Sequence, residues 1–490
     1  MNIALEPDMK EFSYLKEDII SHVKQVAEGK GERIYLVGGW LRDYLLEKKS
    51  NDYDFAVGGE AISLAREVAS SLGGSFFILD PERDCARVVL KGKEQVCLDF
   101  SRLKGDNIAE DLRQRDITIN ALAVDLSGSE TIIDPNGGLP DLSSGRIRLV
   151  SKENLIEDPL RGLRAFRLAA QLGFKIDQDS LRLISQYASL ITRSSEERIR
   201  DELLFLLETK ESYPHLLAMD ETGLLGEIIP ELMPLKGVEQ PGYHHLDVFD
   251  HSTVSLAYLE EITEHCAFHF RAWHNRIAEY LKRPLSSGQS QVALLKLAAL
   301  FHDLGKPQSL TRQGNGQISF TGHERSGAEL AFLIGKKLKL SRDEAERLKK
   351  IVASHMRPGL LANENKISAR AVHRFFRDLG EDGLGTLILS LADRYAARGP
   401  KACSSSVILR QYWVINHLLK RFFEEKEIIT PPRMVGGRDL IEVFGLSPGP
   451  LIGQLLREIE EAYIEGQVKT REEGLALVER LIADRLKAED

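Results

Sequence analysis

The stretch YLVGGWLRDYLLEKKSNDYDFAV, residues 35–57, decides the fold at the start of this 490-residue chain. Its apolar beginning predicts a buried strand that breaks at Gly38 and Gly39, after which residues 40–47 resume with helical spacing. A strand, a glycine turn and a helix N-terminus present free backbone N–H groups that a ligand can approach closely, which suits a phosphate. Glycine pairs are also common as simple turns, so this pattern alone leaves the function open.

The same stretch ends with two carboxylates. Asp52 and Asp54 are two residues apart on a predicted strand, so their side chains share one face of the sheet. Adjacent carboxylates repel each other unless a cation lies between them, and paired Mg²⁺ ions would supply that charge. One ion would activate a hydroxyl nucleophile, and the other would hold a triphosphate and its leaving oxygens. Taken alone, the pair fits a solvated strand edge equally well.

The surrounding pattern predicts an α+β region over residues 1–148. Runs typical of strands alternate with a helical pattern at residues 61–72, and beyond residue 154 the pattern is almost wholly helical. Strand character returns only around residues 314–320, where Asn315 and Gly316 predict a tight hairpin turn. The strands predicted in the first region cover residues 33–37, 53–57, 86–90, 95–100 and 121–124.

Composition excludes several classes of protein. Acidic residues outnumber basic ones by 74 to 65, a formal net charge of −9, so any nucleic acid would have to bind a local basic surface. The four cysteines form no CxxC pair, which argues against a cysteine metal site and fits a reducing compartment. The first ten residues lack a secretory signal pattern, and the richest apolar run is too short to span a bilayer. We therefore expect a soluble, cytoplasmic protein that does not bind membranes.

Five ordered motifs resemble those of the class II nucleotidyltransferases, the family of bacterial and eukaryotic CCA-adding enzymes and bacterial poly(A) polymerases. Residues 35–57 are similar to the first motif, and RQRDITINA at 113–121 is similar to the second, from which Gln114 and Ile117 depart. The later motifs are DPNGGLPDL at 134–142, EDPLRGLRAFRLAAQLGF at 157–174 and SEERIRDEL at 195–203. The resemblance implies a polymerase-beta-like nucleotidyltransferase head with a mixed sheet, followed by a helical neck.

The resemblance assigns roles to the residues of these motifs. Asp52 and Asp54 would hold Mg²⁺ while the 3′-hydroxyl of an RNA attacks the α-phosphate of CTP or ATP and pyrophosphate leaves, and Asp99 is a candidate third carboxylate. Asp158 and Arg161 would read the incoming base by hydrogen bonds. The complete set of implied nucleotide-binding residues is Gly38, Gly39, Arg42, Asp43, Arg115, Asp116, Asn120, Asp158, Arg161, Arg164 and Arg167.

Some of these residues also have a purely local interpretation. Asp43 would orient Arg42, although the two fit a surface ion pair equally well. Asp158 before Pro159 predicts the N-cap and first position of a helix. Arg161, Arg164 and Arg167 follow on that helix, whose other positions are mostly apolar, so their guanidinium groups need anionic or hydrogen-bonding partners.

The chain departs from many complete CCA-adding enzymes at one segment. Only ten residues separate Phe100 from Asp111, where similar enzymes carry a longer flexible loop. A loop that helps to switch the pocket from CTP to ATP cannot act if it is missing. The departure favours addition of part of the CCA end, CC rather than A.

Histidines and aspartates in the helical region resemble the ligands of the HD phosphohydrolase superfamily. The ordered pattern H…HD…D is matched by His251, His302, Asp303 and Asp393. Imidazoles mixed with carboxylates suit a divalent metal that could generate hydroxide for attack on a phosphoester. His323 and His355 would contribute to a second metal or to phosphate binding, and Lys306 would neutralise the phosphate.

The motifs together predict four parts and one principal reaction. The parts are a head at 1–148, a neck at 149–240, an HD domain at 241–400 and a helical C-terminal part at 401–490 that grips tRNA, with Lys420-Arg421 and residues 433–438 as candidate RNA contacts. The reaction is template-independent addition of C, A or both to the 3′ end of tRNA. The alternatives are a poly(A) polymerase, or a phosphohydrolase of RNA ends or cyclic nucleotides driven by the HD residues.

Overall fold

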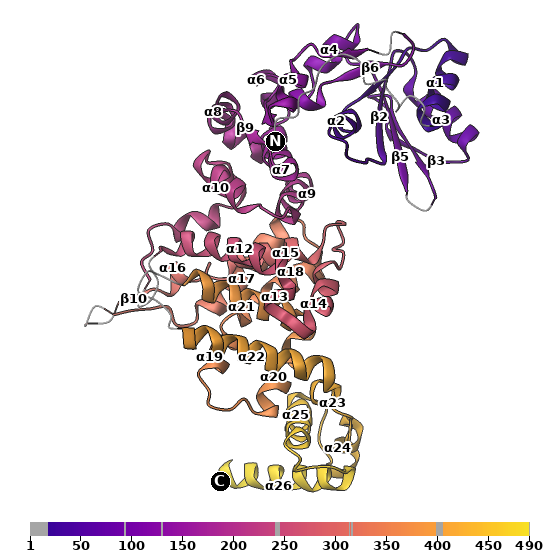
Figure 1. Ribbon diagram of the computed structural model, residues 1–490. Helices are drawn as coiled ribbons and strands as arrows, with labels where there is room; N and C mark the ends of the chain where they lie inside the picture. The colour runs from indigo at the N-terminus through magenta and orange to yellow at the C-terminus, as the bar shows by residue number, and fades with distance from the viewer. Residues whose placement is uncertain are drawn as a thin grey trace. The chain divides into compact units, whose positions relative to one another are not determined.

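The computed structural model describes residues 18–92, 95–128, 131–240, 246–312, 314, 317–397 and 405–489. The chain divides into two compact units, Met1–Pro230 and Glu231–Asp490. The first is mixed α+β and the second is almost entirely helical (Figure 1). The predicted fold class is therefore confirmed, whereas the finer division at residues 148, 240 and 400 stays a prediction.

A seven-stranded mixed sheet forms the head of the first unit. Its order is β3-β4-β5-β2-β1-β6-β7, and every neighbouring pair is antiparallel except β2 with β5. The strands are β1 (Ile34–Val37), β2 (Asp52–Val57), β3 (Ser75–Asp80), β4 (Cys85–Leu90), β5 (Val96–Arg102), β6 (Ala123–Asp125) and β7 (Ile132–Ile133). The sequence did not predict β3 or β7, because a short apolar run such as FFIL does not by itself distinguish a strand from a helix.

Helices α1 (Asp18–Lys30) and α3 (Ala61–Leu72) cover one face of this sheet. The predicted helix at 61–72 is confirmed with the same bounds. Phe55 of β2 belongs to the large core beneath these helices, so the alternation of the strand turns Asp52 and Asp54 to the opposite face. On that face Val37 and Ala56 form a smaller apolar cluster with α4 (Ile108–Arg113). The carboxylates thus lie beside a packed apolar support.

The remaining elements of the first unit are helices and one short pair of strands. They are α2 (Gly39–Leu45), η2 (Thr118–Asn120), α5 (Gly138–Ser143), α6 (Lys152–Glu157), α7 (Leu160–Leu172), α8 (Gln178–Tyr187), η3 (Ala188–Arg193), α9 (Glu196–Glu208), α10 (Tyr213–Glu221) and α11 (Leu224–Ile228), with β8 (Arg146–Ile147) pairing β9 (Lys175–Ile176). The predicted capping role of the Asp158 side chain is wrong. Pro159 precedes α7, which begins at Leu160, and the Asp158 carboxylate instead accepts a charge-assisted hydrogen bond from Arg198.

The second unit consists of packed helices and one small hairpin. Its elements are η4 (Pro230–Leu235, which begins at the boundary), α12 (Val248–Glu264), α13 (Cys266–Phe270), η5 (Arg271–Trp273), α14 (His274–Leu281), α15 (Gln291–Phe301), α16 (Lys306–Ser309), β10 (Thr311–Arg312), β11 (Ile318–Ser319), α17 (His323–Lys337), α18 (Arg342–Ser354), α19 (Arg357–Ala362), α20 (Ala369–Leu379), α21 (Asp382–Ala396), α22 (Ser405–Glu424), α23 (Lys426–Ile429), α24 (Gly437–Phe444), α25 (Pro450–Ile464) and α26 (Arg471–Glu489). The predicted turn at Asn315 and Gly316 lies outside the described residues, between β10 and β11. In the described part of the chain, no helix is long and apolar enough to cross a membrane.

Candidate functional site

The carboxylates of the head lie side by side on one sheet face. Asp54 pairs in register with Asp99 on the parallel neighbour β5, and Asp52 is two residues from Asp54 on the same strand. Paired residues of neighbouring strands point to the same side of a sheet. The structure therefore brings together all three predicted catalytic carboxylates. We call this side of the sheet the carboxylate face.

The glycine turn after β1 is shaped around Asp54. Gly38 has φ +78°, and a Cβ atom at this position would lie 2.5 Å from Oδ2 of Asp54. The next residue, Gly39, donates its backbone N–H to the same carboxylate. Glycine is required at position 38 both for its backbone conformation and for the close approach of the carboxylate. The turn thus fixes the carboxylate at the N-terminus of α2.

Burial and neighbouring negative charges raise the pKa of Asp54. Burial, together with the nearby charges of Asp99 and Asp52, raises the pKa of Asp54 to about 6, although Arg115 and the Gly39 N–H act in the opposite direction. A buried carboxylate beside two others is stabilised in its charged form by a cation. The donor set, oxygen atoms only, fits Mg²⁺.

Asp99 is held by an arginine that the sequence did not single out. Arg87 of β4 pairs with Asp99 in register and donates Nε and Nη2 to its two carboxylate oxygens, each at 2.7 Å. This ion pair raises the pKa of Arg87. The third predicted carboxylate is thus next to Asp54 but engaged in a bidentate ion pair. Its role as a metal ligand stays a prediction.

Arg42 is held in a defined orientation on the first turn of α2. It donates to both oxygens of Asp43 at 2.8 Å and to Oδ1 of Asn120 at 2.8 Å. Its guanidinium nitrogens also lie near Gly39, within 3.7 Å of where a Cβ on that glycine would stand. These three polar residues, all in the predicted nucleotide-binding set, therefore form one connected group beside the glycine turn.

A cleft of about 1050 Å³ opens between the strand ends and the helix α7. It is large enough for a nucleotide. Five predicted nucleotide-binding residues line it, namely Arg115, Asp116, Asp158, Arg161 and Arg164. Arg115 also connects the cleft to the carboxylate face, because its charge lowers the pKa of Asp54.

The two predicted base-reading residues are positioned by neighbours in the cleft. Arg161 is only 8% exposed and donates Nη1 to the backbone carbonyl of Arg115 at 3.0 Å. Burial lowers the pKa of this guanidinium, although Asp116 and Asp158 partly offset the effect. Asp158 accepts from Nη2 of Arg198 at 2.8 Å. A neighbouring group thus holds each of these two side chains in place, and both side chains line the cleft. Hydrogen bonding to a base edge requires side chains that are held in this way.

Arg164 and Arg167 both pair with one acidic residue, Glu202, which the sequence did not single out. Glu202 of α9, nearly buried, accepts from Nε of Arg164 at 3.0 Å and from Nε of Arg167. Arg164 also donates to Asp116 at 3.0 Å, and this pairing outweighs burial and lowers the pKa of Asp116. Arg167 does not line the cleft, and its ion pair with Glu202 ties α7 to α9. Its predicted nucleotide contact therefore has no geometric support.

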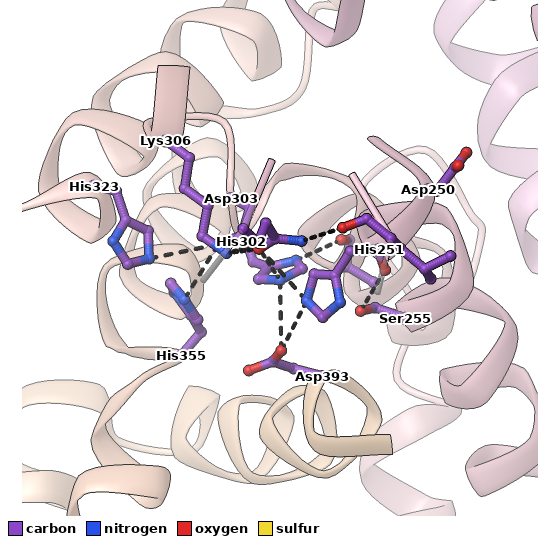
Figure 2. Close-up of polar contacts among 12 residues, drawn as sticks. Asp250, His251, Ser255, His302, Asp303, Lys306, His323, His355 and Asp393 are labelled. Atoms are coloured by element: carbon purple, nitrogen blue, oxygen red, sulfur yellow. Dashed lines mark hydrogen bonds and ion pairs between the residues drawn. The ribbon is translucent and has the colours of Figure 1, made fainter. Parts of the chain in front are cut away.

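Six residues of the second unit form a buried cluster, shown in Figure 2. Two sets of three have ligand atoms within 4.8 Å of one another: His251, His302 and Asp393, and Asp303, His323 and His355. Helices α12, α15, α17, α18 and α21 carry these residues or end beside them. The structure therefore brings together every metal ligand that the sequence predicts in this region.

Backbone contacts set the orientation of three imidazoles in the cluster. The Nδ1 atoms of His302, His323 and His355 lie 2.7 to 2.8 Å from backbone carbonyls of Ala299, Phe320 and Val352. A proton on Nδ1 leaves the Nε2 lone pair of each ring for a ligand. The buried Nε2 atoms of His302 and His323 make no hydrogen bond among the described residues. This arrangement fits a divalent metal.

Charges within the cluster support the same conclusion. Asp303 accepts from Lys306 Nζ at 2.6 Å and lies 3.2 Å from Nε2 of His302. Although burial acts to raise it, the pKa of Asp303 is well below its usual value because His302 and Lys306 are so close. Burial, followed by the charge of His302, lowers the pKa of His355 to about 4, so this imidazole is neutral at physiological pH. Asp303 and Asp393 raise the pKa of His302 despite its burial, so binding of a metal by this imidazole would displace a proton.

Comparison with known proteins identifies the family to which this chain belongs. The family model of the Poly A polymerase head domain matches residues 34–148, and that of the HD domain matches residues 248–398. The A-adding tRNA nucleotidyltransferase of Deinococcus radiodurans is 36% identical over 451 residues, which cover 91% of this chain and 94% of that protein. This chain belongs to the tRNA nucleotidyltransferase family.

Other relatives and solved structures agree with this family. The CC-adding tRNA nucleotidyltransferase of Thermus thermophilus is 34% identical, with 90% of this chain and 92% of the relative covered. A tRNA nucleotidyltransferase domain 2 model matches residues 415–478, and the probable RNA and SrmB-binding site of polymerase A matches residues 173–236. Among solved structures, the Thermotoga maritima CCA-adding enzyme complexed with tRNA has the same fold, with a TM-score of 0.61, 20% identity and coverage of 94% of this chain and 96% of that one.

The glycine turn of this tRNA nucleotidyltransferase provides a first prediction. Replacing Gly38 with Ala is expected to lower nucleotide transfer about tenfold, because the new Cβ would displace the Asp54 carboxylate from its position. The measurement is the initial rate of tRNA extension. Gly73→Ala is the matched control, since Gly73 also has a positive φ of +66° but a Cβ added there would have no atom within 4 Å. Equal losses in both variants would show that backbone strain alone causes the effect.

The six clustered residues of the second unit, which we call the HD cluster, provide a second prediction for this tRNA nucleotidyltransferase. Purified protein is expected to retain a transition metal that chelation removes, because the cluster combines imidazoles with carboxylates. His302→Ala and His323→Ala should each lower the metal content measured by elemental analysis, whereas His265→Ala, at an exposed histidine, should not. Unchanged metal content in both cluster variants would contradict a metal centre here.

Proposed function

We propose that this chain transfers CMP from CTP to the 3′ end of a tRNA. The observation that carries the proposal is the carboxylate face with its glycine turn, next to a nucleotide-sized cleft that Asp158 and Arg161 line. Three relatives named as tRNA nucleotidyltransferases that add A or CC support tRNA as the acceptor.

The residues of the first unit would divide the reaction between them. Asp52 and Asp54 would hold Mg²⁺, which supplies charge neutralisation and activation of the attacking hydroxyl. Arg42, oriented by Asp43 and Asn120, would bind phosphate oxygens beside the glycine turn. Asp158 and Arg161 would select the base by hydrogen bonding to its edge, since a wrong edge would leave them without partners.

The product proposed is CC rather than A or the complete CCA end. The connection between β5 and α4 is only residues 103–107, and it is closed by hydrogen bonds from the Lys104 N–H to Asp111 and from the Asp106 N–H to Glu110. A short, bonded connection has little freedom to remodel the cleft for a second base. The relatives do not decide the matter, because the A-adding one is 36% identical and CC-adding ones are 34% and 32% identical.

The test is extension of three tRNA transcripts that end before the first C, after one C and after CC. Each is incubated with CTP, ATP or both, and the products are resolved by length. Addition of C only to the first two transcripts supports the proposal. Addition of A to the CC transcript would make the enzyme A-adding or CCA-adding, and long tails of A on all three would make it a poly(A) polymerase. A protein that extends none of them would refute transferase function.

We also propose a phosphohydrolase activity of the HD cluster towards phosphoesters of RNA ends or cyclic nucleotides. The observation behind it is the pair of adjoining three-residue ligand sets, which would suit two metal ions, with Lys306 at their edge. Release of phosphate from RNA bearing a 3′-phosphate or a 2′,3′-cyclic phosphate tests this activity. No release with the metal-loaded protein would leave the cluster as a structural centre.

A further inference from the structure

The carboxylate face continues beyond the carboxylates to the edge of the sheet. Asp54 pairs in register with Asp99, Asp99 with Arg87 of β4, and Arg87 with Phe77 of the edge strand β3. Paired residues share a face, so the four side chains form one row across four strands. Three interstrand steps place Phe77 about 14 Å from Asp54.

The outer half of this row is open to solvent. Phe77 is 51% exposed, and the Arg87 side chain is 43% exposed. The large core lies on the other face, where Phe76 packs against it, so core packing does not account for Phe77. Arg87 uses Nε and Nη2 for Asp99, and its Nη1 makes no hydrogen bond among the described residues. An exposed aromatic ring and a guanidinium nitrogen therefore lie side by side on the face that carries the carboxylates.

We propose that Phe77 and Arg87 form a platform for the single-stranded 3′ end of the acceptor RNA. Phe77 stacks on a base near the end, and Nη1 of Arg87 contacts a backbone phosphate. This inference rests on the proposed function, because the 3′-hydroxyl must reach Asp52 and Asp54. The cleft beside Ser101 and Arg161 is then taken by the incoming nucleotide, so the acceptor strand has to run along the part of the sheet that remains open.

The chemistry of the platform suits an end whose last base changes. The first acceptor ends in the base that precedes the CC end and the second acceptor ends in C, so a contact that reads the hydrogen-bond pattern of one base would fail at one of the two steps. Stacking on an aromatic ring tolerates any base, because every base has a π face, and an arginine contact to phosphate is equally indifferent to sequence. Specificity remains with Asp158 and Arg161, which face the incoming nucleotide.

The test compares two neighbouring residues of β3 that are similarly exposed. Phe77→Ala is expected to lower kcat/KM for the tRNA transcript about tenfold, from the loss of base stacking, while KM for CTP stays unchanged. Phe77→Leu keeps an apolar side chain but has no π face, and it should lose as much as alanine, whereas Phe77→Trp should restore activity. Ile78→Ala is the matched control, because Ile78 is 46% exposed but pairs with Ala86 on the core side.

Several outcomes would overturn the platform. Wild-type kcat/KM for tRNA in both Phe77→Ala and Phe77→Leu would do so, as would an equal loss in Ile78→Ala. Conversion of a dimer to a monomer by both alanine variants, measured by light scattering, would assign the edge strand to pairing between copies instead. A wild-type enzyme that extends no transcript would refute the proposed function itself, so the two failures are distinguishable.

Discussion

Replacing Asp54 with Asn is expected to lower the rate of nucleotide transfer by at least about 10³-fold, because a divalent metal contributes several kcal/mol to such a reaction. The substitution keeps the shape of the side chain and its fit against Gly38. It removes the negative charge, and Mg²⁺ binds amide oxygens more weakly than carboxylates. The measurement is single-turnover extension of a tRNA transcript by CTP over a range of Mg²⁺ concentrations.

Two comparisons make this prediction specific. Asp52→Ala should lose activity to a similar extent, whereas Asp179→Asn, at an exposed carboxylate on α8, should behave as wild type. The metal content of the HD cluster should be unchanged in all three variants, because its ligands belong to the second unit. Transfer by Asp54→Asn within tenfold of wild type would eliminate the carboxylate face as the catalytic centre. Loss of both transfer and bound metal from a folded variant would contradict two independent sites.

The sequence predicts those parts of the head site whose geometry is local. Gly38, Arg42 and Asp54 lie within one strand, turn, helix and strand, where periodicity and glycine positions fix which side chains share a face. Arg87 and Glu202 were not predicted, because their partners are set by strand register and helix packing between distant segments. A buried arginine requires an anionic partner, and this requirement was visible on α7, but it does not say which acidic residue supplies the charge.

The same distinction holds for Asp158 and for the HD cluster. Asp158 has the pattern of an N-cap, yet the tertiary contact with Arg198 takes its carboxylate. The sequence predicted the order of the HD ligands and a second metal or phosphate site at His323 and His355, but it did not place Asp303 with those two histidines. His302 and Asp303 are adjacent in sequence, directly after α15, yet belong to different sets, and this depends on which helices pack around the end of α15.

Arg161→Ala is expected to reduce the preference for CTP over UTP by about 10²-fold, the effect of losing hydrogen bonds from a charged donor to the base edge. Arg161 is nearly buried at the cleft, and the Arg115 carbonyl holds one nitrogen, which leaves the rest of the guanidinium to meet a base edge. The measurement is kcat/KM for each nucleoside triphosphate on the same transcript.

A lysine at this position tests whether geometry or charge selects the base. Arg161→Lys keeps the positive charge but not the planar fork, so it should lose most of the selectivity if hydrogen-bond geometry is responsible. Arg182→Ala, an exposed arginine of α8, is the control and should retain wild-type preference. If Arg161→Ala slows all nucleotides equally, Arg161 only supports the Arg115 backbone. Base selection would then have to come from Asp158 or from elsewhere in the cleft.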